Sequence, residues 1–236
     1  MMVFTAAQKR LLPWIDVETW ERLDAAARTL LEWNQRINVV SRKGLDATTL
    51  VERHYLPALA LLGVPGLRER WEEGVSVLDA GTGGGFPGLP LAIACPNAAF
   101  TLADGRGRKI TVVDACAEAA AAANVRALHG RVPDDVTPRS FDFVLGRSVA
   151  RLPAFIRAVE PVLRRGGPRD GSLLLENGVL YVKGGDFEDE LAELGVRPRR
   201  DLQLDTLIGG VGGDKRALFF PTSDLDSSSS SSSSSS

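Results

Sequence analysis

The sequence has few residues of the types that build metal centres, disulfide frameworks and membrane spans. Its 236 residues include only two cysteines and two histidines, which lie far apart and fit no zinc-ligand spacing. No run of about 18 uncharged apolar residues occurs, and the N-terminus has no apolar stretch of signal-peptide length. We therefore expect no metal site, no disulfide framework and no membrane span.

An excess of positive charge is also missing. The chain has 28 Lys and Arg against 30 Asp and Glu, so its formal net charge is -2. Proteins that bind a nucleic-acid backbone are usually basic overall, so any contact with nucleic acid has to come from local basic clusters. Hydrophobic residues make up 44% of the chain, which is enough for one core.

Apolar spacing divides the chain into a helical part and an alternating part. Apolar residues three and four apart over residues 16–38, after Asp16 as N-cap, predict an amphipathic helix. A second helix begins near Asp46, and Pro57 should kink or end it. From residue 75 onward, strands and helices alternate, which predicts an α/β fold with a parallel sheet covered by helices on both faces. The expected strands are 75–79, 100–104, 125–129, 141–145 and 179–182, the expected helices 108–123, 153–163 and 187–194, and the closing antiparallel pair 200–207 and 215–220.

These patterns give three predicted regions. Residues 1–66 form an N-terminal helical section, residues 67–221 form the α/β domain with a loop at 166–171, and residues 222–236 form a tail. The tail carries ten consecutive serines, which cannot bury apolar surface, so we expect it to be disordered.

A glycine-rich loop follows the first predicted strand. Gly83, Gly85 and Gly88 match G-x-G-x-x-G, a pattern that also occurs in dehydrogenases. Asp79, two residues before Gly81, argues against a dinucleotide, since a carboxylate would repel a pyrophosphate at the following helix N-terminus. It suits a cationic ligand, and S-adenosylmethionine carries an ammonium and a sulfonium. A carboxylate that holds the loop by accepting N–H bonds is the alternative role, and the two can coexist.

A second acid, Asp104, ends the next predicted strand. At this position of a nucleoside-binding sheet, a carboxylate accepts hydrogen bonds from the ribose hydroxyls. The alternative is a turn residue, because Asp104-Gly105 is a common turn pair. We favour the ribose role.

An ordered set of motifs resembles one family of enzymes. These motifs are LEWNQRIN (31–38), RH (53–54), DAGTGGGFPG (79–88), GRSVA (146–150) and VKGG (182–185). In this set the chain is similar, over roughly residues 20–220, to the RsmG (GidB) family, which methylates N7 of a guanosine in small-subunit ribosomal RNA with S-adenosylmethionine. The resemblance implies a Rossmann-like class I methyltransferase sheet with an N-terminal helical extension.

The resemblance also implies roles for individual residues. Gly81 and Phe86 would contact the methionine and adenosine portions of the cofactor, Val132 and Pro133 would border the adenine, and Arg147 would line the cleft between cofactor and substrate. The chain departs from the family at Pro57-Ala58, where Asp-Ser is common, and at Pro133, where an acid is common. The second departure puts the adenine contact at Pro133 in question.

The chemistry of a guanine N7 acceptor fits the scarcity of histidine. The GRSVA segment cannot grip an exocyclic amine as a polar-Pro-Pro-aromatic loop does, and we place both cysteines in the core, so neither is a nucleophile for a pyrimidine. Guanine N7 has an in-plane lone pair and needs no general base, so orientation supplies most of the acceleration. Arg147 is then the candidate catalytic residue, bonding guanine O6 or a phosphate. We assign His54 to a helix surface or the core.

Local basic residues are the candidates for contact with RNA. Arg106, Arg108 and Lys109 follow the ribose acid, and Lys183 ends the fifth predicted strand. For each, a solvated surface charge is the alternative role. We expect a partner in small-subunit ribosomal RNA or a ribosomal particle, a monomeric state, and a location in the cytoplasm or, alternatively, the plastid stroma.

Three other functions stay open at this point. A small-molecule methyltransferase would use the helical section as a lid over the cleft. A noncatalytic factor would bind cofactor or RNA without methyl transfer. An NAD-dependent enzyme would bind a dinucleotide at the glycine loop instead of S-adenosylmethionine.

Overall fold

A seven-stranded sheet forms the centre of the molecule. The computed structural model describes residues 2–168 and 174–229. The strands lie in the order β3-β2-β1-β4-β5-β7-β6, in which β1 to β5 are parallel and β7 runs antiparallel to both of its neighbours. Their bounds are β1 (Ser76–Ala80), β2 (Ala99–Asp104), β3 (Val125–His129), β4 (Phe143–Arg147), β5 (Gly178–Lys183), β6 (Arg200–Gln203) and β7 (Arg216–Pro221). The predicted α/β class, parallel sheet and closing antiparallel pair are confirmed.

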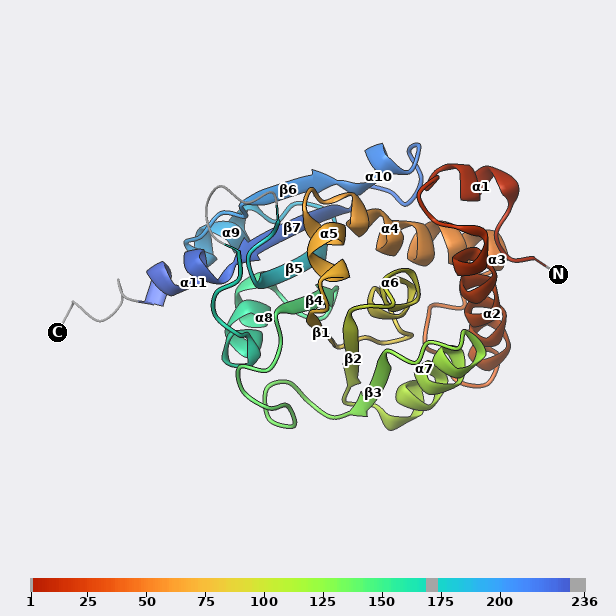
Figure 1. Cartoon of the computed structure of the whole chain (residues 1–236), viewed down its shortest axis with the longest axis horizontal. Helices are drawn as coiled ribbons and strands as arrows, with labels where there is room; N and C mark the ends of the chain where they lie inside the picture. Colours follow the sequence, from red (N-terminus) through yellow and green to blue (C-terminus); the bar gives the residue numbers. More distant parts are fainter. Residues whose placement is uncertain (1, 169–173, 230–236) are drawn as a thin grey trace.

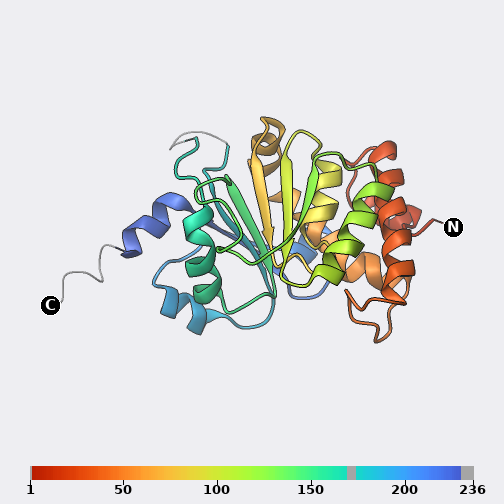
Figure 2. The same cartoon turned by 90° about the horizontal axis from the view of Figure 1, so that it is seen from below.

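Helices cover both faces of this sheet, as Figures 1 and 2 show. One face packs against α6 (Gly88–Ala94), α7 (Gly107–Ala119) and the N-terminal helices, and together they form the larger apolar cluster. The other face packs against α8 (Leu152–Val159), the short 3-10 turn η3 (Glu160–Val162) and α9 (Glu188–Leu194), which form a second cluster. Strand side chains alternate between these two clusters, as the pleat of a strand requires.

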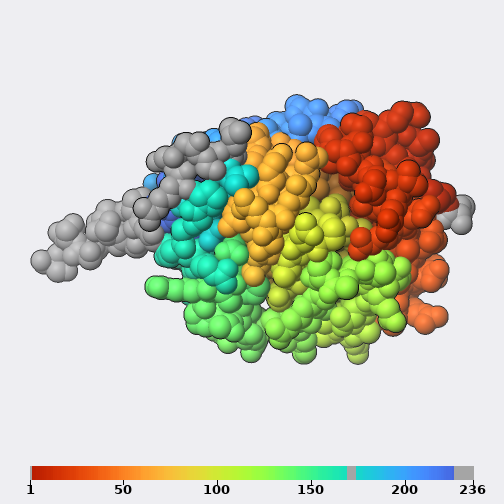
Figure 3. Space-filling model, in the orientation of Figure 1, coloured from red at the N-terminus to blue at the C-terminus, as the bar shows by residue number. Residues whose placement is uncertain are grey.

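The N-terminal helices pack onto the α/β part and share its larger apolar cluster. Figure 3 shows the red N-terminal segment, which contains α2 (Val17–Asn34), against the green segment that contains α7. The Asp16 side chain accepts a hydrogen bond from the Thr19 amide at 2.7 Å and begins the long helix as predicted. The bounds are α1 (Ala6–Arg10), α2 (Val17–Asn34), α3 (Ala47–Leu50), η1 (Val51–Tyr55), α4 (Leu56–Leu59), η2 (Ala60–Gly63) and α5 (Leu67–Glu72).

The backbone changes its helical geometry around Pro57. The helical path runs from α3 through η1, which is a π-helical turn, into α4, whose second residue is Pro57. A proline inside a helix has no N–H to donate and its ring crowds the carbonyl four residues earlier. The wider π-helical turn η1 lets the helical path continue past Pro57 instead of ending at it.

Two expectations about the C-terminal part are wrong. Residues 204–207, expected in a strand, form the short helix α10 (Leu204–Leu207), because the i and i+4 spacing of Leu204 and Ile208 buries both side chains. The tail expected to be disordered from residue 222 begins as α11 (Thr222–Ser229). Thr222 donates from its amide to the Asn177 carbonyl at 2.9 Å, and Leu225 is buried. The rest of the predicted tail, residues 230–236, and part of the predicted loop 166–171 lie outside the described residues.

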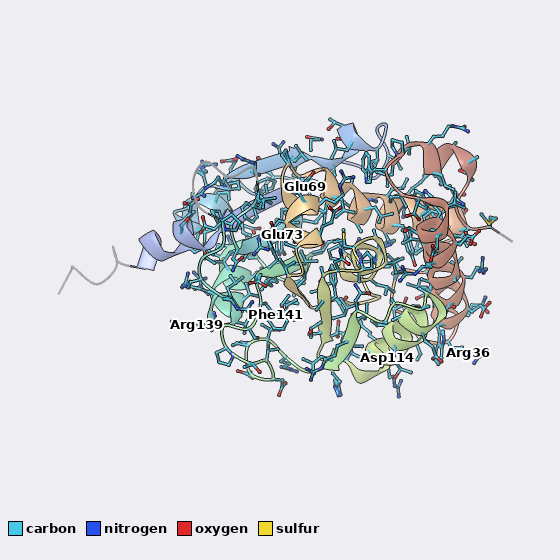
Figure 4. The ribbon with its side chains drawn as sticks, in the orientation of Figure 1. Arg36, Glu69, Glu73, Asp114, Arg139 and Phe141 are labelled. Atoms are coloured by element: carbon cyan, nitrogen blue, oxygen red, sulfur yellow. The ribbon has the colours of Figure 1, made fainter. Side chains whose placement is uncertain are left out.

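The parallel strands define two opposite edges of the sheet. Figure 4 labels Glu73, which follows α5, and Phe141, which lies just before β4. These segments meet where the Asp142 amide donates to the Ser76 carbonyl at 2.8 Å, so they mark the edge at which β1 and β4 begin. The glycine loop and the other predicted site residues follow the carboxyl ends of the strands, at the opposite edge, where ligands bind in open α/β sheets.

Candidate functional site

Asp79 holds the glycine loop from inside the protein. Its side chain is fully buried, and its Oδ2 accepts hydrogen bonds from Thr82 Oγ1 at 2.7 Å and from the Gly88 amide at 2.8 Å. Its Oδ1 is buried as well and has no hydrogen-bond partner among the described residues. Burial raises the pKa of the Asp79 carboxyl to about 6, although Thr82, Gly88 and the charge of Arg147 act in the other direction.

Two glycines of the loop allow a close approach that any side chain would block. Gly81 has φ +77°, and a Cβ there would lie 2.9 Å from both methyl carbons of Val149. At Gly88 a Cβ would lie 2.3 Å from Leu102 Cδ2 and 2.8 Å from Asp79 Cβ. Gly81 therefore lets the segment after β4 rest on the loop, and Gly88 lets α6 begin directly beside β1 and β2.

Asp104 lies beside the glycine loop and is nearly buried. Its Oδ2 accepts from the Gly83 amide at 3.0 Å and lies 3.4 Å from Lys109 Nζ, while its Oδ1 accepts from the Arg106 amide at 2.9 Å. The carboxylate thus joins the loop after β1 to the loop after β2, and it also makes the local turn contact that was the alternative to a ribose role. Each carboxylate oxygen has two lone pairs, so these contacts leave acceptor capacity.

A pocket of about 240 Å³ opens at the carboxyl ends of β1, β2 and β3. Its walls are mainly apolar, with Val132, Val149 and Phe155 among the lining side chains, and Gly81 and Asp104 lie at its border. The pocket thus combines apolar surface with the Asp104 carboxylate, and Arg131 also lines it. This combination suits a ligand that has a flat apolar ring and neighbouring hydroxyls.

Five residues predicted for cofactor binding lie outside the lining of this pocket: Asp79, Gly83, Phe86, Pro133 and Arg147. Pro133 follows Val132, is half-buried, and accepts from the Val136 amide through its carbonyl at 3.1 Å. Phe86 is buried on the other face of the loop, with its ring 5.0 Å from Tyr55 and 5.1 Å from His54 between ring centroids. In this arrangement Phe86 supports the neighbouring residues of the N-terminal helices.

A second, larger pocket of about 610 Å³ lies between the N-terminal helices, the end of β4 and the loop before β7. Its cationic side chains are Arg53, Arg147 and Lys215, and His54 and Glu52 also line it. Burial, and then the charges of Arg147 and Arg53, lower the pKa of Lys215. Concentrated positive charge of this kind attracts a phosphate or the acceptor edge of a guanine.

Arg147 and His54 form the centre of this basic pocket. Arg147 Nη2 lies 3.0 Å from His54 Nδ1, and the guanidinium carbon lies 5.2 Å from the centre of the Phe86 ring. Burial, and then the charge of Arg147, lowers the pKa of His54 to about 3, so the imidazole is neutral and Nδ1 accepts from the guanidinium. Burial also lowers the pKa of Arg147 to about 10, which leaves it charged at neutral pH.

The predicted RNA contacts occupy different environments. Arg106 and Arg108 are exposed at the start of α7, whereas Lys109 is paired with Asp104. Lys183 is paired with Glu190, with Nζ–Oε distances of 2.8 and 3.0 Å. Of these four residues, only Arg106 and Arg108 present exposed charge.

The participation of His54, Arg53 and Lys215 in the basic pocket was not predicted from the sequence. His54 had been assigned to a helix surface or the core, although the RH motif was part of the family resemblance and could have indicated a role. Lys215 follows the glycines of residues 209–213, and this clustering of glycines beside a lysine was the available signal.

The four residues after Gly146 separate the two pockets. Arg147 and Ser148 line the basic pocket, and Val149 and Ala150 line the apolar pocket. Ser148 has φ +53°, an uncommon conformation for a residue other than glycine, and it redirects the chain from one pocket to the other. Two ligands bound in these pockets would lie on either side of this segment.

Comparisons with known proteins agree on one family. The family model described as GidB, rRNA small subunit methyltransferase G, matches residues 20–197. A protein of Cytophaga hutchinsonii named Ribosomal RNA small subunit methyltransferase G is 42% identical over 174 residues, which are 74% of this chain and 78% of that protein. One of the same name from Christiangramia forsetii is 37% identical over 185 residues, covering 78% and 82% of the two chains.

Solved structures share the fold at low sequence identity. A SAM-dependent methyltransferase from Aquifex aeolicus superposes with a TM-score of 0.51 at 14% identity, covering 75% of this chain and 94% of that one. A mutant of MtNAS in complex with S-adenosylmethionine gives a TM-score of 0.52 at 13% identity, covering 90% and 81%. Within residues 2–168 and 174–229, no group of three or more His, Cys, Asp or Glu could hold a metal ion, and no helix is long and apolar enough to cross a bilayer.

Proposed function

Because the chain belongs to the GidB family of rRNA small subunit methyltransferases, we propose that it transfers a methyl group from S-adenosylmethionine to N7 of a guanosine in small-subunit ribosomal RNA. The family predicted from the sequence motifs is confirmed, and with it the enzyme class of ribosomal RNA methyltransferase. Beyond the family, we propose the cofactor site, the target atom and the roles of individual residues.

The apolar pocket has the properties that the methyl donor requires. Asp104 Oδ1, which accepts one hydrogen bond, has a lone pair left for a ribose hydroxyl, and Val132 and Phe155 give apolar surface for the adenine. Gly81 keeps the approach to the loop open, and the buried Asp79 has an unpartnered carboxylate oxygen that a nearby positive charge would stabilise. S-adenosylmethionine, when bound there, supplies an electrophilic methyl group on a sulfonium.

The basic pocket is the proposed site of the guanosine. Arg147 has N–H groups beyond the one that points at His54, and these can bond guanine O6 or a phosphate oxygen. With the methyl donor bound, the guanine N7 lone pair would take up its methyl group, and the positive charge would pass from the donor to the base. No proton has to leave, so no general base is needed. A neutral His54 adds no further positive charge beside the base.

The observation that carries the proposal is the placement of one segment, residues 147–150, between a pocket suited to a nucleoside and a pocket suited to an anionic, hydrogen-bond-accepting substrate. This segment would place a donor and an acceptor on its two sides, and their mutual orientation is the main requirement for methyl transfer to a good nucleophile. The acceptor guanosine has to be unstacked to enter.

Methyl transfer to purified small ribosomal subunits tests the proposal. Subunits from a bacterial strain that lacks this methylation are incubated with the protein and S-adenosylmethionine labelled in the methyl group, and the digested RNA is analysed for N7-methylguanosine. The expected result is one N7-methylguanosine per subunit, at a single position. Label that appears only in small molecules, or binding of the cofactor without any transfer, would refute it.

A further inference from the structure

Lys183 lies at the end of β5, but its charge is directed into the protein. Its Nζ is 2.8 Å from Glu190 Oε1 and 3.0 Å from Oε2, and the two side chains are only 18% and 14% exposed. A cation that is paired with a carboxylate inside the fold has little charge left for a phosphate. The contact with Glu190 thus argues against the RNA role expected for Lys183.

Glu190 connects this pair to the start of α8. Its Oε2 also accepts a hydrogen bond from the Leu152 amide at 2.7 Å. Leu152 is the first residue of α8, and Arg151 at the N-cap provides no side-chain cap. Glu190 therefore satisfies one of the free amides at the helix start, where a negative charge is also favourable. Burial alone would raise the pKa of Glu190, but the Leu152 amide and Lys183 outweigh it, and the pKa is lowered.

A second contact from β5 fixes the residues that precede α8. Tyr181, two residues before Lys183 on the same face of β5, donates from its hydroxyl to the Ala150 carbonyl at 2.7 Å. Two hydrogen bonds therefore hold residues 147–151 between the two pockets, one at the Ala150 carbonyl and one at the Leu152 amide. Arg147 extends from this segment into the basic pocket, and Val149 extends over Gly81 into the apolar pocket.

We propose that Lys183 and Glu190 are positioning residues: through the Leu152 amide they hold residues 147–151 so that Arg147 and Val149 face their two pockets together. The proposal rests on the proposed function for the meaning of the two pockets. It replaces direct contact between Lys183 and RNA phosphate with an indirect role in the alignment of donor and acceptor.

The variants Glu190→Gln and Lys183→Met separate these two roles. If Lys183 contacted RNA, Glu190→Gln would remove a competing negative charge and leave turnover unchanged or improve RNA binding. As a positioning residue, Glu190 is needed for turnover, and both variants should lower kcat about 10-fold to 100-fold with the KM for RNA within about 2-fold of the original value. The double variant should be no worse than the more severe single variant, because the two residues act through one contact.

Two further measurements, the salt dependence of KM and the affinity for the cofactor, distinguish a positioning role from a general loss of stability. The slope of log KM for RNA against log salt concentration should stay unchanged, whereas loss of a phosphate contact would reduce it by about 0.7 to 0.9. Calorimetry should show weaker binding of S-adenosylmethionine in both single variants, since Val149 borders its proposed pocket. Thermal unfolding verifies that each variant is folded, and the isosteric Glu190→Gln remains informative if Lys183→Met is not.

The matched control removes a similar ion pair from the same helix. Arg197 pairs with Glu188 of α9 at 2.5 Å, and both side chains are about two-thirds exposed, at 66% and 64%. Arg197→Met should leave kcat and cofactor affinity unchanged. The proposal is overturned if Lys183→Met raises the KM for RNA and lowers the salt slope while Glu190→Gln retains full kcat. It is also overturned if the losses of kcat in the two single variants add up in the double variant. Turnover of the unaltered protein tests the proposed function separately, and weaker cofactor binding in both variants would support the positioning role even without it.

Discussion

Asp79→Asn should make the protein more stable at neutral pH and at the same time weaken binding of the methyl donor. Asp79 is fully buried, one carboxylate oxygen has no partner among the described residues, and its pKa is raised from 3.8 to about 6. The pKa of Asp79 differs by about two units between the folded and unfolded protein. The ionised carboxylate therefore lowers the free energy of unfolding by about 3 kcal/mol. Asparagine removes this charge with almost no change in shape.

The sign follows from the direction of the shift. Because the folded-state pKa is higher than the unfolded one, the stability contributed by protonated Asp79 is fully present below about pH 3.8 and is lost as the pH rises through about 6. Asparagine resembles the protonated form and keeps an acceptor for Thr82 and Gly88. Its amide replaces the unpartnered oxygen and costs part of the gain, so we expect a net increase of about 1 to 2 kcal/mol at pH 8.

Urea unfolding of both proteins at pH 4 and pH 8 measures this difference. The variant should be more stable than the original protein by about 1 to 2 kcal/mol at pH 8, and less stable by about 1 kcal/mol at pH 4, where Asp79 is protonated in the folded protein and the cost of the unpartnered amide remains. Asp142→Asn is the matched control, since Asp142 is also buried but bonds Arg164, Asn177 and the Ser76 amide, and its loss should destabilise the protein at pH 8. An Asp79→Asn variant that is less stable at pH 8, or equally shifted at both pH values, would refute the reasoning.

The same variant tests why a destabilising acid is present. If Asp79 stabilises a cationic ligand, calorimetry should show at least about a 10-fold weaker affinity for S-adenosylmethionine in Asp79→Asn. A stabilised variant with unchanged affinity would leave Asp79 with the loop-holding role alone.

Three further variants test other parts of the site. Gly88→Ala should lower the free energy of unfolding by about 2 to 3 kcal/mol in urea titrations, because its Cβ would lie 2.3 Å from Leu102 Cδ2. Arg147→Lys, which loses the planar set of donors, should lower kcat about 100-fold in the RNA methylation assay and leave cofactor affinity within about 2-fold; an equal loss of affinity would contradict the separation of the two pockets. The acidic limb of the pH profile of kcat/KM should lie near pH 6, at the pKa of Asp79, and should persist in His54→Asn, because the pKa of His54 is about 3. Loss of that limb in His54→Asn would contradict the neutral imidazole.

Local signals in the sequence were sufficient for most of the sheet and for the glycine loop. Short apolar runs that alternate with amphipathic helices indicate a parallel sheet, since strands covered by helices on both faces are buried along their whole length. Asp16 is a local N-cap signal, and the helix begins after it. The predictions failed where distant contacts decide: residues 204–207 turn into α10 to bury Leu204, and Thr222 continues into α11 because Asn177 and a site for Leu225 lie beside it.

The sequence by itself determined the fold class, the enzyme family and the positions of Asp79, Asp104 and the glycines, because these depend on residue types at short, fixed spacings. Only the tertiary structure decided which charges are paired and which ligands they can meet. His54 and Arg147 are 93 residues apart in the chain and share one hydrogen bond, and Lys183 is turned inward by Glu190. Charge pairing and desolvation depend on distance and burial in the folded chain, and the order of residues specifies neither until the chain has folded.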